Sequence, residues 1–179
     1  MDKFYTVDIA GVKRDLLRCA INEKLDIAAF NMFGDVEITV HVAAELLKKL
    51  PEFDYIVTPE AKSIPLAYEM SRQSGKKYFV ARKKEKIYMK DPVAVEVKSI
   101  TTNSVQRLIF DSRDGEEIRG KRVVLLDDVI STGESIAAVE ALAQKFDCNI
   151  VAKAAVLAEG DAALREDITF LAVIPLIEK

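Results

Sequence analysis

The stretch VVLLDDVISTGES, residues 123–135, decides the fold. It begins with four apolar residues flanked by charge, which is the pattern of a buried strand in a parallel sheet. Asp127 and Asp128 follow this run directly, and a small polar turn comes next. Apolar residues then recur at helical spacing, at Ile136, Val139 and Phe146 among others. This order predicts a strand, a turn and a helix in an α/β protein, with the turn at the carboxyl end of the strand.

The polar turn, residues 131–135, predicts an anion site. Backbone N–H groups at a helix N-terminus have no partner within the helix, and they hold phosphate groups well. Gly133 lets the backbone come close to an anion, and the hydroxyls of Ser131, Thr132 and Ser135 can donate further hydrogen bonds. The two preceding carboxylates suit sugar hydroxyls or the water shell of a Mg²⁺ ion. We therefore expect a phosphorylated sugar to bind here.

The alternative is a strand that ends in two solvated acids before an ordinary N-cap. A cap needs one hydroxyl, whereas this segment has three around a glycine. The sequence contains neither a GxxxxGK[ST] phosphate loop nor a GxGxxG dinucleotide motif, so these two common sites are not expected. The acids and the turn together favour a sugar-phosphate site.

Length and charge set further limits. A chain of 179 residues predicts a single domain that folds without disulfides or a structural metal. No run approaches the roughly 18 apolar residues of a membrane span, and the first residues lack the apolar core of a signal peptide. We therefore expect a cytoplasmic protein that does not bind membranes. The net charge of −3 argues against nucleic acid as a partner.

Few residues suit metal or nucleophilic chemistry. Cys19 and Cys148 are isolated, and we expect both to be small buried hydrophobic residues. His41 is the only histidine, and it lies in a predicted helix. Neither a zinc site nor a Ser-His-Asp triad is therefore expected.

Strand and helix patterns alternate along the chain. Residues 5–33 predict a small lobe of short strands with a turn at Gly11, and residues 93–111 predict a β-hairpin that turns near residues 102–104. The other elements are predicted helices at 37–50 and 64–73 and predicted strands at 54–58, 77–82, 123–126, 150–157 and 169–174. This alternation predicts an open, mainly parallel sheet flanked by helices in a single domain.

The acids and the turn resemble the phosphoribosyl pyrophosphate (PRPP) motif of the type I phosphoribosyltransferases. Asp127, Asp128 and residues 131–135 match that motif position by position, with STGES in place of an ATGGT-like ending. The resemblance spans residues 54–174. It implies a small N-terminal hood at residues 1–35 and a mobile loop and hairpin at 83–111. It also implies that the two acids face the ribose and, through water and PRPP, Mg²⁺, and that the residues after them hold the sugar phosphate: Val129, Ile130, Ser131, Thr132, Gly133, Glu134 and Ser135.

The loop TPEAKS, residues 58–63, is predicted at the carboxyl end of a strand and before a helix, so it shares the crevice with the acids. It resembles the pyrophosphate loop of adenine-type phosphoribosyltransferases, usually ESRGF. Glu60 stands in place of the glutamate, Lys62 in place of the arginine and Ser63 in place of the glycine. The resemblance implies that Glu60, Ala61 and Lys62 bind PRPP. An ordinary turn with exposed charges is the alternative.

The segment RKKEKIYMK, residues 82–90, gathers five cations against one acid in a chain of negative charge. Cations around a departing pyrophosphate stabilise the charge that develops there. The segment resembles the RKxGK that opens the mobile catalytic loop of adenine and xanthine phosphoribosyltransferases, where the arginine often serves a neighbouring subunit. This implies PRPP-binding roles for Arg82, Lys83 and Lys86, and a homodimer. A solvated basic loop is the alternative.

Taken together, the resemblance implies a purine phosphoribosyltransferase that uses Mg²⁺, with Asp127, Arg82 and Lys62 in catalysis and adenine as the first candidate acceptor. Glu159 and Gly160 are placed in the base pocket by position alone. The hairpin reads ITTN, residues 100–103, where adenine enzymes have a leucine-glutamate-tyrosine-glycine stretch. The missing glutamate leaves two alternatives: a PRPP-sensing regulator without activity, or a transferase for xanthine, guanine or another base.

Overall fold

The computed structural model describes residues 3–98 and 105–179. Its centre is a parallel sheet with the strand order β10-β9-β8-β4-β5. This confirms the predicted open parallel sheet. The strands are β4 (Tyr55–Pro59), β5 (Lys77–Ala81), β8 (Arg122–Ile130), β9 (Asn149–Glu159) and β10 (Ala172–Ile174).

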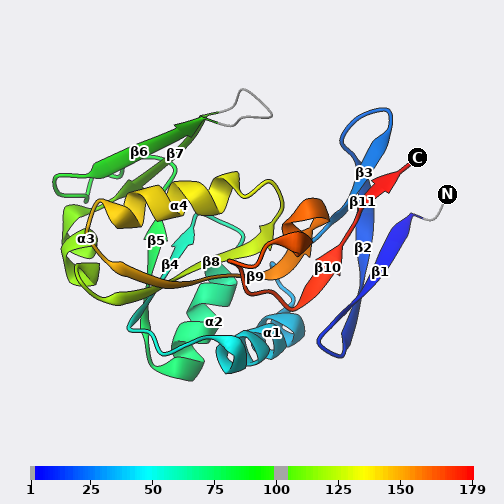
Figure 1. Ribbon diagram of the computed structural model, residues 1–179, viewed down its shortest axis with the longest axis horizontal. Helices are drawn as coiled ribbons and strands as arrows, with labels where there is room; N and C mark the ends of the chain where they lie inside the picture. Colours follow the sequence, from blue (N-terminus) through cyan, green and yellow to red (C-terminus); the bar gives the residue numbers. More distant parts are fainter. Residues whose placement is uncertain (1–2, 99–104) are drawn as a thin grey trace.

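Helices pack on both faces of this sheet (Figure 1). Two of them, α1 (Val36–Lys49) and α2 (Ile64–Ser74), cover one face, and α4 (Glu134–Gln144) covers the other. Because side chains alternate along a strand, β8 contributes to both cores: Val124 and Leu126 join the α1 and α2 side, and Val123 and Leu125 join the α4 side. Among the described residues, no helix is long and apolar enough to cross a bilayer.

The N-terminal lobe is an antiparallel sheet beside the central one (Figure 1). Its strands are β1 (Phe4–Ile9), β2 (Val12–Ala20), β3 (Leu25–Ala29) and β11 (Leu176–Glu178). The turn predicted at Gly11 joins β1 to β2, and Gly11 has a φ of +96°. The sequence did not predict β11, which returns from the C-terminal end to pair with β3. We call this four-stranded sheet the hood.

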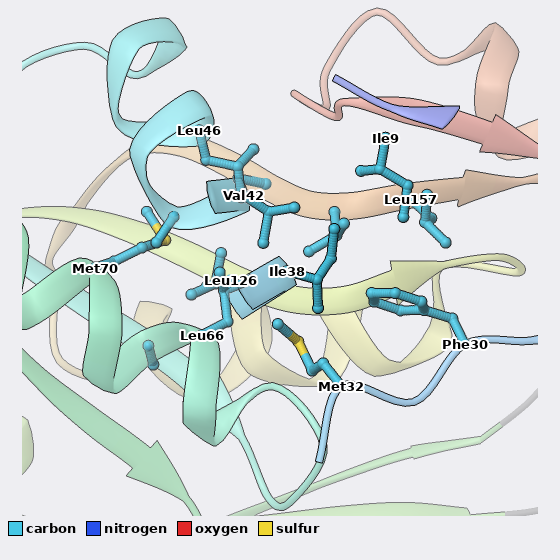
Figure 2. Close-up of a cluster of buried hydrophobic side chains, with 14 of the residues drawn as sticks. Ile9, Phe30, Met32, Ile38, Val42, Leu46, Leu66, Met70, Leu126 and Leu157 are labelled. Carbon is cyan, nitrogen blue, oxygen red and sulfur yellow. The ribbon is translucent and has the colours of Figure 1, made fainter. Parts of the chain in front are cut away.

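The hood shares a hydrophobic core with the central sheet. Ile9 of β1 and Phe30, just after β3, are buried in one cluster with Ile38 of α1 and Leu126 of β8. Figure 2 shows these side chains converging between α1, the strands and the hood segment. The hood is therefore packed onto the domain along the same face as α1.

The predicted hairpin forms a separate two-stranded sheet of β6 (Val93–Lys98) and β7 (Val105–Phe110). It is connected to the end of β5, because Arg82 and Ile109 exchange backbone hydrogen bonds of 2.9 and 2.8 Å. The turn predicted near residues 102–104 lies outside the described residues. So do residues 100–103, where the sequence lacks the family's glutamate.

The structure differs from the sequence prediction at several boundaries. Strand β8 continues to Ile130 rather than ending at Leu126, because its second half still pairs with β9. The predicted strand 169–174 shortens to β10, and Thr169 makes only an isolated bridge to Ala154. Two short helices were not predicted: α3 (Ser112–Ile118) and the 3₁₀ helix η1 (Gly160–Leu164).

The two cysteines and the histidine, for which the sequence predicted no catalytic or metal-binding role, lie outside the crevice described below. Cys19 and Cys148 are half-buried, not buried as predicted. Partial burial raises the pKa of the Cys148 thiol, whose Sγ lies 3.4 Å from the carbonyl oxygen of Ala143. His41 lies on α1 as predicted, and its Nε2 is 2.8 Å from the carbonyl oxygen of Ala10 in the hood.

Candidate active site

The turn after β8 encloses a small cavity at the N-terminus of α4. Gly133 is the N-cap residue, with a φ of +82°, and its carbonyl accepts the first helical hydrogen bond, from Ala137, at 3.0 Å. The backbone N–H groups between them belong to the first helical turn, which has no acceptors within the helix. The cavity measures about 160 Å³ and is lined by Gln106, Asp127, Val129, Ile130, Ser131, Thr132, Gly133, Glu134, Ser135 and Ile136. All seven residues predicted to hold the sugar phosphate are therefore gathered around it.

The two acids lie inside β8 and are nearly buried. Asp127 is 6% exposed and Asp128 is 4% exposed. The backbone N–H of Asp128 donates to Oδ1 of Asp127 at 2.9 Å. Burial, and then the neighbouring charge of Asp128, raise the pKa of Asp127 to about 7. Such a shift is typical of functional carboxylates, because a folded chain gains nothing from burying two like charges together.

Lys62 connects the TPEAKS loop to the acids. Its Nζ lies 2.7 Å from Oδ2 of Asp128. The approach is that of an ion pair rather than of an aligned hydrogen bond, because the buried Oδ2 atom accepts no hydrogen bond from the described residues. The Lys62 side chain is 53% exposed. The Asp128 side chain is only 5% exposed, so an incoming anion can draw Lys62 away only where another cation compensates the buried charge of Asp128.

A buried hydroxyl pair fixes the start of the same loop. Thr58 lies near the end of β4 and is fully buried. Its Oγ1 lies 2.9 Å from the carbonyl oxygen of Leu126 and 2.7 Å from Oγ of Ser63. Ser63 Oγ in turn donates to the carbonyl of Pro59 at 3.2 Å. These contacts hold the loop against β8, two residues before Asp128. The sequence analysis did not single out Thr58, since a threonine inside a strand pattern carries no sign of this role.

A second cavity, of about 240 Å³, lies between the TPEAKS loop and the acids. It is lined by Pro59, Glu60, Ala61, Lys62, Ser63, Lys83, Gln106, Leu108, Asp127, Asp128, Val129 and Ser135. The loop residues predicted to bind pyrophosphate therefore face the acids across it. Gln106 of β7 borders this cavity and the previous one, and the sequence analysis missed it, because strand register alone decides where a hairpin residue points.

The predicted cations of residues 82–90 are placed unequally. Lys83 is exposed and lines the second cavity, whereas Lys86 is half-buried and lines none of the cavities described here. Arg82 Nε lies 3.2 Å from Oε2 of Glu60, beside the cavity. The same oxygen accepts the backbone N–H of Lys83 at 3.0 Å, and this bond, with the nearby charges of Arg82 and Lys86, lowers the pKa of Glu60. Glu60 thus braces the start of the basic segment.

A third cavity, of about 480 Å³, opens beneath the hood. Glu159, predicted for the base pocket, lines it, but Gly160 does not and instead packs near Leu176. Six of the eleven lining residues come from β3 of the hood and the residues just after it, none of which the sequence analysis assigned to the site individually. The lining residues are Ile27, Ala28, Ala29, Phe30, Asn31, Phe33, Lys62, Val129, Ser131, Glu159 and Ile174.

The three cavities meet in one place. Val129 lines all of them, Lys62 lines the second and the third, and Ser131 lines the first and the third. A ligand lying over Val129 would reach the α4 N-terminus, the acids with the TPEAKS loop, and the cavity beneath the hood. This arrangement suits a sugar that carries a phosphate group at each end and lies beside a planar ring.

The chain has a donor set for a cation shared with a ligand. In the described part of the chain, no three His, Cys, Asp or Glu side chains come together as a complete metal site. Mg²⁺ usually keeps several waters and takes one or two carboxylates plus substrate phosphates. Asp127 and Asp128, with the Oδ2 atom of Asp128 lacking a hydrogen bond among the described residues, fit that mode. These residues would hold the ion through water or through PRPP.

Comparison with known families decides the assignment. The family model described as "Phosphoribosyl transferase domain" matches residues 35–177. The chain belongs to this phosphoribosyltransferase family. The match begins at the residue before α1 and ends in β11, so it contains every residue that lines the first two cavities. It does not include β3 and the residues just after it, which line the third cavity.

Similar proteins in this phosphoribosyltransferase family act on different bases. A hypoxanthine/guanine phosphoribosyltransferase of Methanothermobacter thermautotrophicus is 31% identical over 128 residues, covering 71% of this chain and 63% of that protein. An orotate phosphoribosyltransferase of Thermoanaerobacter sp. is 27% identical over 126 residues, covering 70% of this chain and 55% of that protein. The chain therefore spans less than two thirds of the length of either relative.

A solved structure supports the fold. The adenine phosphoribosyltransferase of Thermoanaerobacter pseudethanolicus superposes with a TM-score of 0.70 at 18% identity, covering 88% of this chain and 95% of that one. The likeness confirms the phosphoribosyltransferase fold predicted from the sequence.

Proposed function

We propose that this protein is a purine phosphoribosyltransferase. It transfers the 5-phosphoribosyl group of PRPP to a ring nitrogen of a purine, with adenine as the acceptor, and releases pyrophosphate. The observation that carries this proposal is the junction of three cavities over Val129, one at a helix N-terminus, one beside paired acids and a lysine, and one beneath the hood.

Each cavity takes one part of the reaction. The α4 N-terminus and the hydroxyls of the turn hold the 5′-phosphate. Asp127 and Asp128 face the ribose, and the purine enters beneath the hood. Lys62 leaves Asp128 to bind the pyrophosphate, with Lys83 beside it. Bound Mg²⁺ would supply charge neutralisation on the pyrophosphate.

The reaction needs no covalent nucleophile. The bond between the anomeric carbon and the pyrophosphate oxygen breaks, the bond from that carbon to the base nitrogen forms, and the base loses a proton to solvent or to a nearby acceptor. Positive charge develops on the sugar while negative charge develops on the leaving group. Holding both substrates in line and placing fixed charges around the leaving group therefore provide the catalysis.

Several observations support adenine as the acceptor base. The fold resembles that of an adenine phosphoribosyltransferase, and the segments at residues 58–63 and 82–90 resemble adenine-type loops. The base cavity is also within the range of about 300–1,000 Å³ that small-molecule sites occupy.

The test is a pyrophosphate-release assay with PRPP, Mg²⁺ and a panel of nucleobases. We expect release with adenine, and loss of PRPP binding by calorimetry when Asp127→Asn and Asp128→Asn are combined. The exposed Glu166→Gln variant is the matched control, since Glu166 lines none of the three cavities. Unchanged PRPP affinity in the double variant would show that the acids do not form the sugar site.

A PRPP-sensing regulator is the second candidate, because residues 100–103 lack the acid that adenine enzymes carry in the hairpin. The same assay separates the two. A regulator would bind PRPP in calorimetry and release no pyrophosphate with any base in the panel.

A further inference from the structure

The cavity beneath the hood contains two polar groups that no described residue uses. Asn31 Oδ1 accepts the backbone N–H of Phe33 at 3.1 Å, which fixes the orientation of its amide. Its Nδ2 atom is then left with N–H donors that make no hydrogen bond to residues 3–98 or 105–179. A donor therefore borders the cavity on the hood side.

Glu159 supplies the second group, on the opposite wall. It is the last residue of β9, where it pairs with Ile174 of β10, and both residues line the cavity. The side chain is half-buried, and its carboxylate makes neither a hydrogen bond nor an ion pair with any described residue. An ionised carboxylate only accepts hydrogen bonds. The wall formed by β9 therefore requires N–H donors from whatever binds.

The remaining charge in the cavity does not offset this acid. Lys62 also lines the cavity, but its Nζ lies 2.7 Å from Asp128 and would serve the pyrophosphate. The other lining residues are apolar except for Asn31 and Ser131. Phe30 and Phe33 supply aromatic surface, which stabilises any flat ring by burial and stacking but does not distinguish one base from another.

We propose that Glu159 determines the specificity of the acceptor, by selecting a purine with an exocyclic amino group. The amino group donates to the Glu159 carboxylate, and the Asn31 amide donates to an acceptor atom of the ring. This inference rests on the proposed function and narrows it to aminopurines. Orotate carries a carboxylate, which would meet the like charge of Glu159. Xanthine has carbonyl oxygens at the positions where adenine and guanine carry amino groups, so in the same pose it would place an acceptor against Glu159 and leave only its ring N–H groups as donors.

This chemistry separates base classes that the family as a whole accepts. Hydrogen bonds to a charged group are worth about 1.5–3 kcal/mol each, so one such bond changes kcat/KM by roughly 10- to 100-fold. A polar site also rejects a base that leaves its groups unpaired more strongly than an apolar pocket does. Glu159 would therefore discriminate against orotate and xanthine by about this factor, although PRPP binding is the same for all bases.

The experiment compares the wild type with Glu159→Gln, Glu159→Lys and the control Glu166→Gln. For each, kcat/KM is measured with adenine, guanine, xanthine and orotate, and KM is measured for PRPP. We expect Glu159→Gln to lower kcat/KM for the aminopurines by roughly tenfold, because the glutamine carbonyl still accepts a hydrogen bond but without the charge, with the KM for PRPP unchanged. Glu159→Lys should raise the orotate-to-adenine ratio, because it reverses the charge on this wall.

Equal base preference in the wild type and both Glu159 variants would overturn the inference while leaving the proposed transfer intact. If the wild type released no pyrophosphate with any base, the transfer proposal would be wrong. Calorimetric binding of adenine in the presence of PRPP and Mg²⁺ would then test Glu159 alone. Weaker binding in Glu159→Gln would support its role, and unchanged or undetectable wild-type binding would refute it.

Discussion

At the scale of single residues, Asp127 shows how burial is used in this site. A carboxylate next to another carboxylate, both nearly buried, is costly to ionise, and the pKa of Asp127 rises to about 7 as a result. In the free protein, a buried aspartic acid that keeps its proton contributes no more to stability than an asparagine would. We therefore expect Asp127 to act by binding a ligand in its ionised form.

The first prediction concerns the pH dependence of stability. In the unfolded chain an aspartate has a pKa of about 3.9, so between that pH and about 7 the folded state holds a proton that the unfolded state has lost. Stability from this group is therefore complete at low pH and falls as pH rises, by at most about 1.4 kcal/mol per pH unit. Asp127→Asn cannot ionise, so it should lack this decline.

The measurement is urea unfolding from pH 5 to 8 for the wild type, Asp127→Asn and the exposed control Glu166→Gln. The free energy of unfolding of the wild type should fall relative to Asp127→Asn up to about pH 7 and run parallel to it at higher pH. Parallel curves for the wild type and Asp127→Asn over the whole range would show that Asp127 has an ordinary pKa.

Gly133 is constrained in two ways. Its φ of +82° disfavours any side chain, and a Cβ there would overlap the guanidinium of Arg165. Moving Arg165 aside would disturb its ion pair with Asp167, whose carboxylate its Nε and Nη2 bind at 2.9 and 2.8 Å; the pair is partly exposed and contributes about 0–1 kcal/mol. Lys153 Nζ, 3.2 Å from Asp167, holds the same carboxylate.

We therefore predict that Gly133→Ala destabilises the protein by about 1–2 kcal/mol through backbone strain, and raises the KM for PRPP about tenfold or more, since 1.4 kcal/mol of lost binding is a factor of ten. In an Arg165→Ala background the contact is relieved and the strain remains. In that background, Gly133→Ala should lower the free energy of unfolding by less than it does in the wild type, but by more than zero. An identical decrease in the two backgrounds would mean that Arg165 moves aside without any loss of stability.

At the scale of elements, the sequence predicted the helices and strands whose apolar periodicity ends at a residue that terminates such an element. The α2 helix is one example: its apolar spacing and Gly75, in the left-handed conformation at its end, both mark its bounds. The α3 helix is too short for a periodic pattern, and its start depends on the cap that the Asp111 side chain makes with the backbone N–H of Arg113, at 3.0 Å.

The residues of the candidate site were likewise predictable only where a local pattern marks them. The acids and the turn lie within one continuous segment, so the sequence pattern predicted both. Gln106, Asn31 and Phe33 reach the cavities through strand pairing and the position of the hood, which depend on contacts between residues far apart in the chain. No local pattern marks such residues. The position of β11 was missed for the same reason.

The basic segment is held at both ends. At its start, the backbone of Arg82 bonds to Ile109, and the Lys83 N–H donates to Glu60 at 3.0 Å. At its end, Arg113 Nη2 donates to the carbonyl of Tyr88 at 2.8 Å, and the Lys90 N–H and carbonyl bond to Asp111 and Ser112 at 3.3 and 3.2 Å. The cations between these two ends repel one another until an anion is present. Within the mobile loop and hairpin expected at residues 83–111, we therefore predict that residues 84–87 move.

Hydrogen exchange tests this prediction directly. With PRPP and Mg²⁺, exchange at residues 84–87 should slow, because each cation gains a partner when pyrophosphate is bound. The Lys83 and Lys90 N–H groups, which are hydrogen-bonded without ligand, should be protected in both states and serve as internal controls. Slowing should be weaker in Lys62→Ala, which holds pyrophosphate poorly. Equal exchange with and without saturating PRPP would identify residues 84–87 as an ordinary surface loop.

At the scale of the whole molecule, the site lies where two sheets meet. The central sheet supplies the acids and the turn at residues 131–135, and β3 with the residues just after it supplies most of the cavity proposed for the base. Phe30 lies both in the shared core and on the wall of that cavity, so a change in the packing of the hood would reach it. Under the proposed function, such a change would alter base preference more than PRPP binding.

The last prediction is a homodimer in which Arg82 serves the site of the partner subunit. In one chain Arg82 pairs with Glu60 at 3.2 Å, with both side chains partly exposed, and such a pair contributes only about 0–1 kcal/mol. A more negative pyrophosphate in a neighbouring site can displace it. Exchanging subunits between Arg82→Ala and Asp127→Asn proteins would rebuild one intact site in each mixed dimer, so random mixing should restore roughly a quarter of wild-type activity. If Arg82 acts within its own chain, every site in the mixture stays defective, and proven subunit exchange without recovery of pyrophosphate release would refute the shared site.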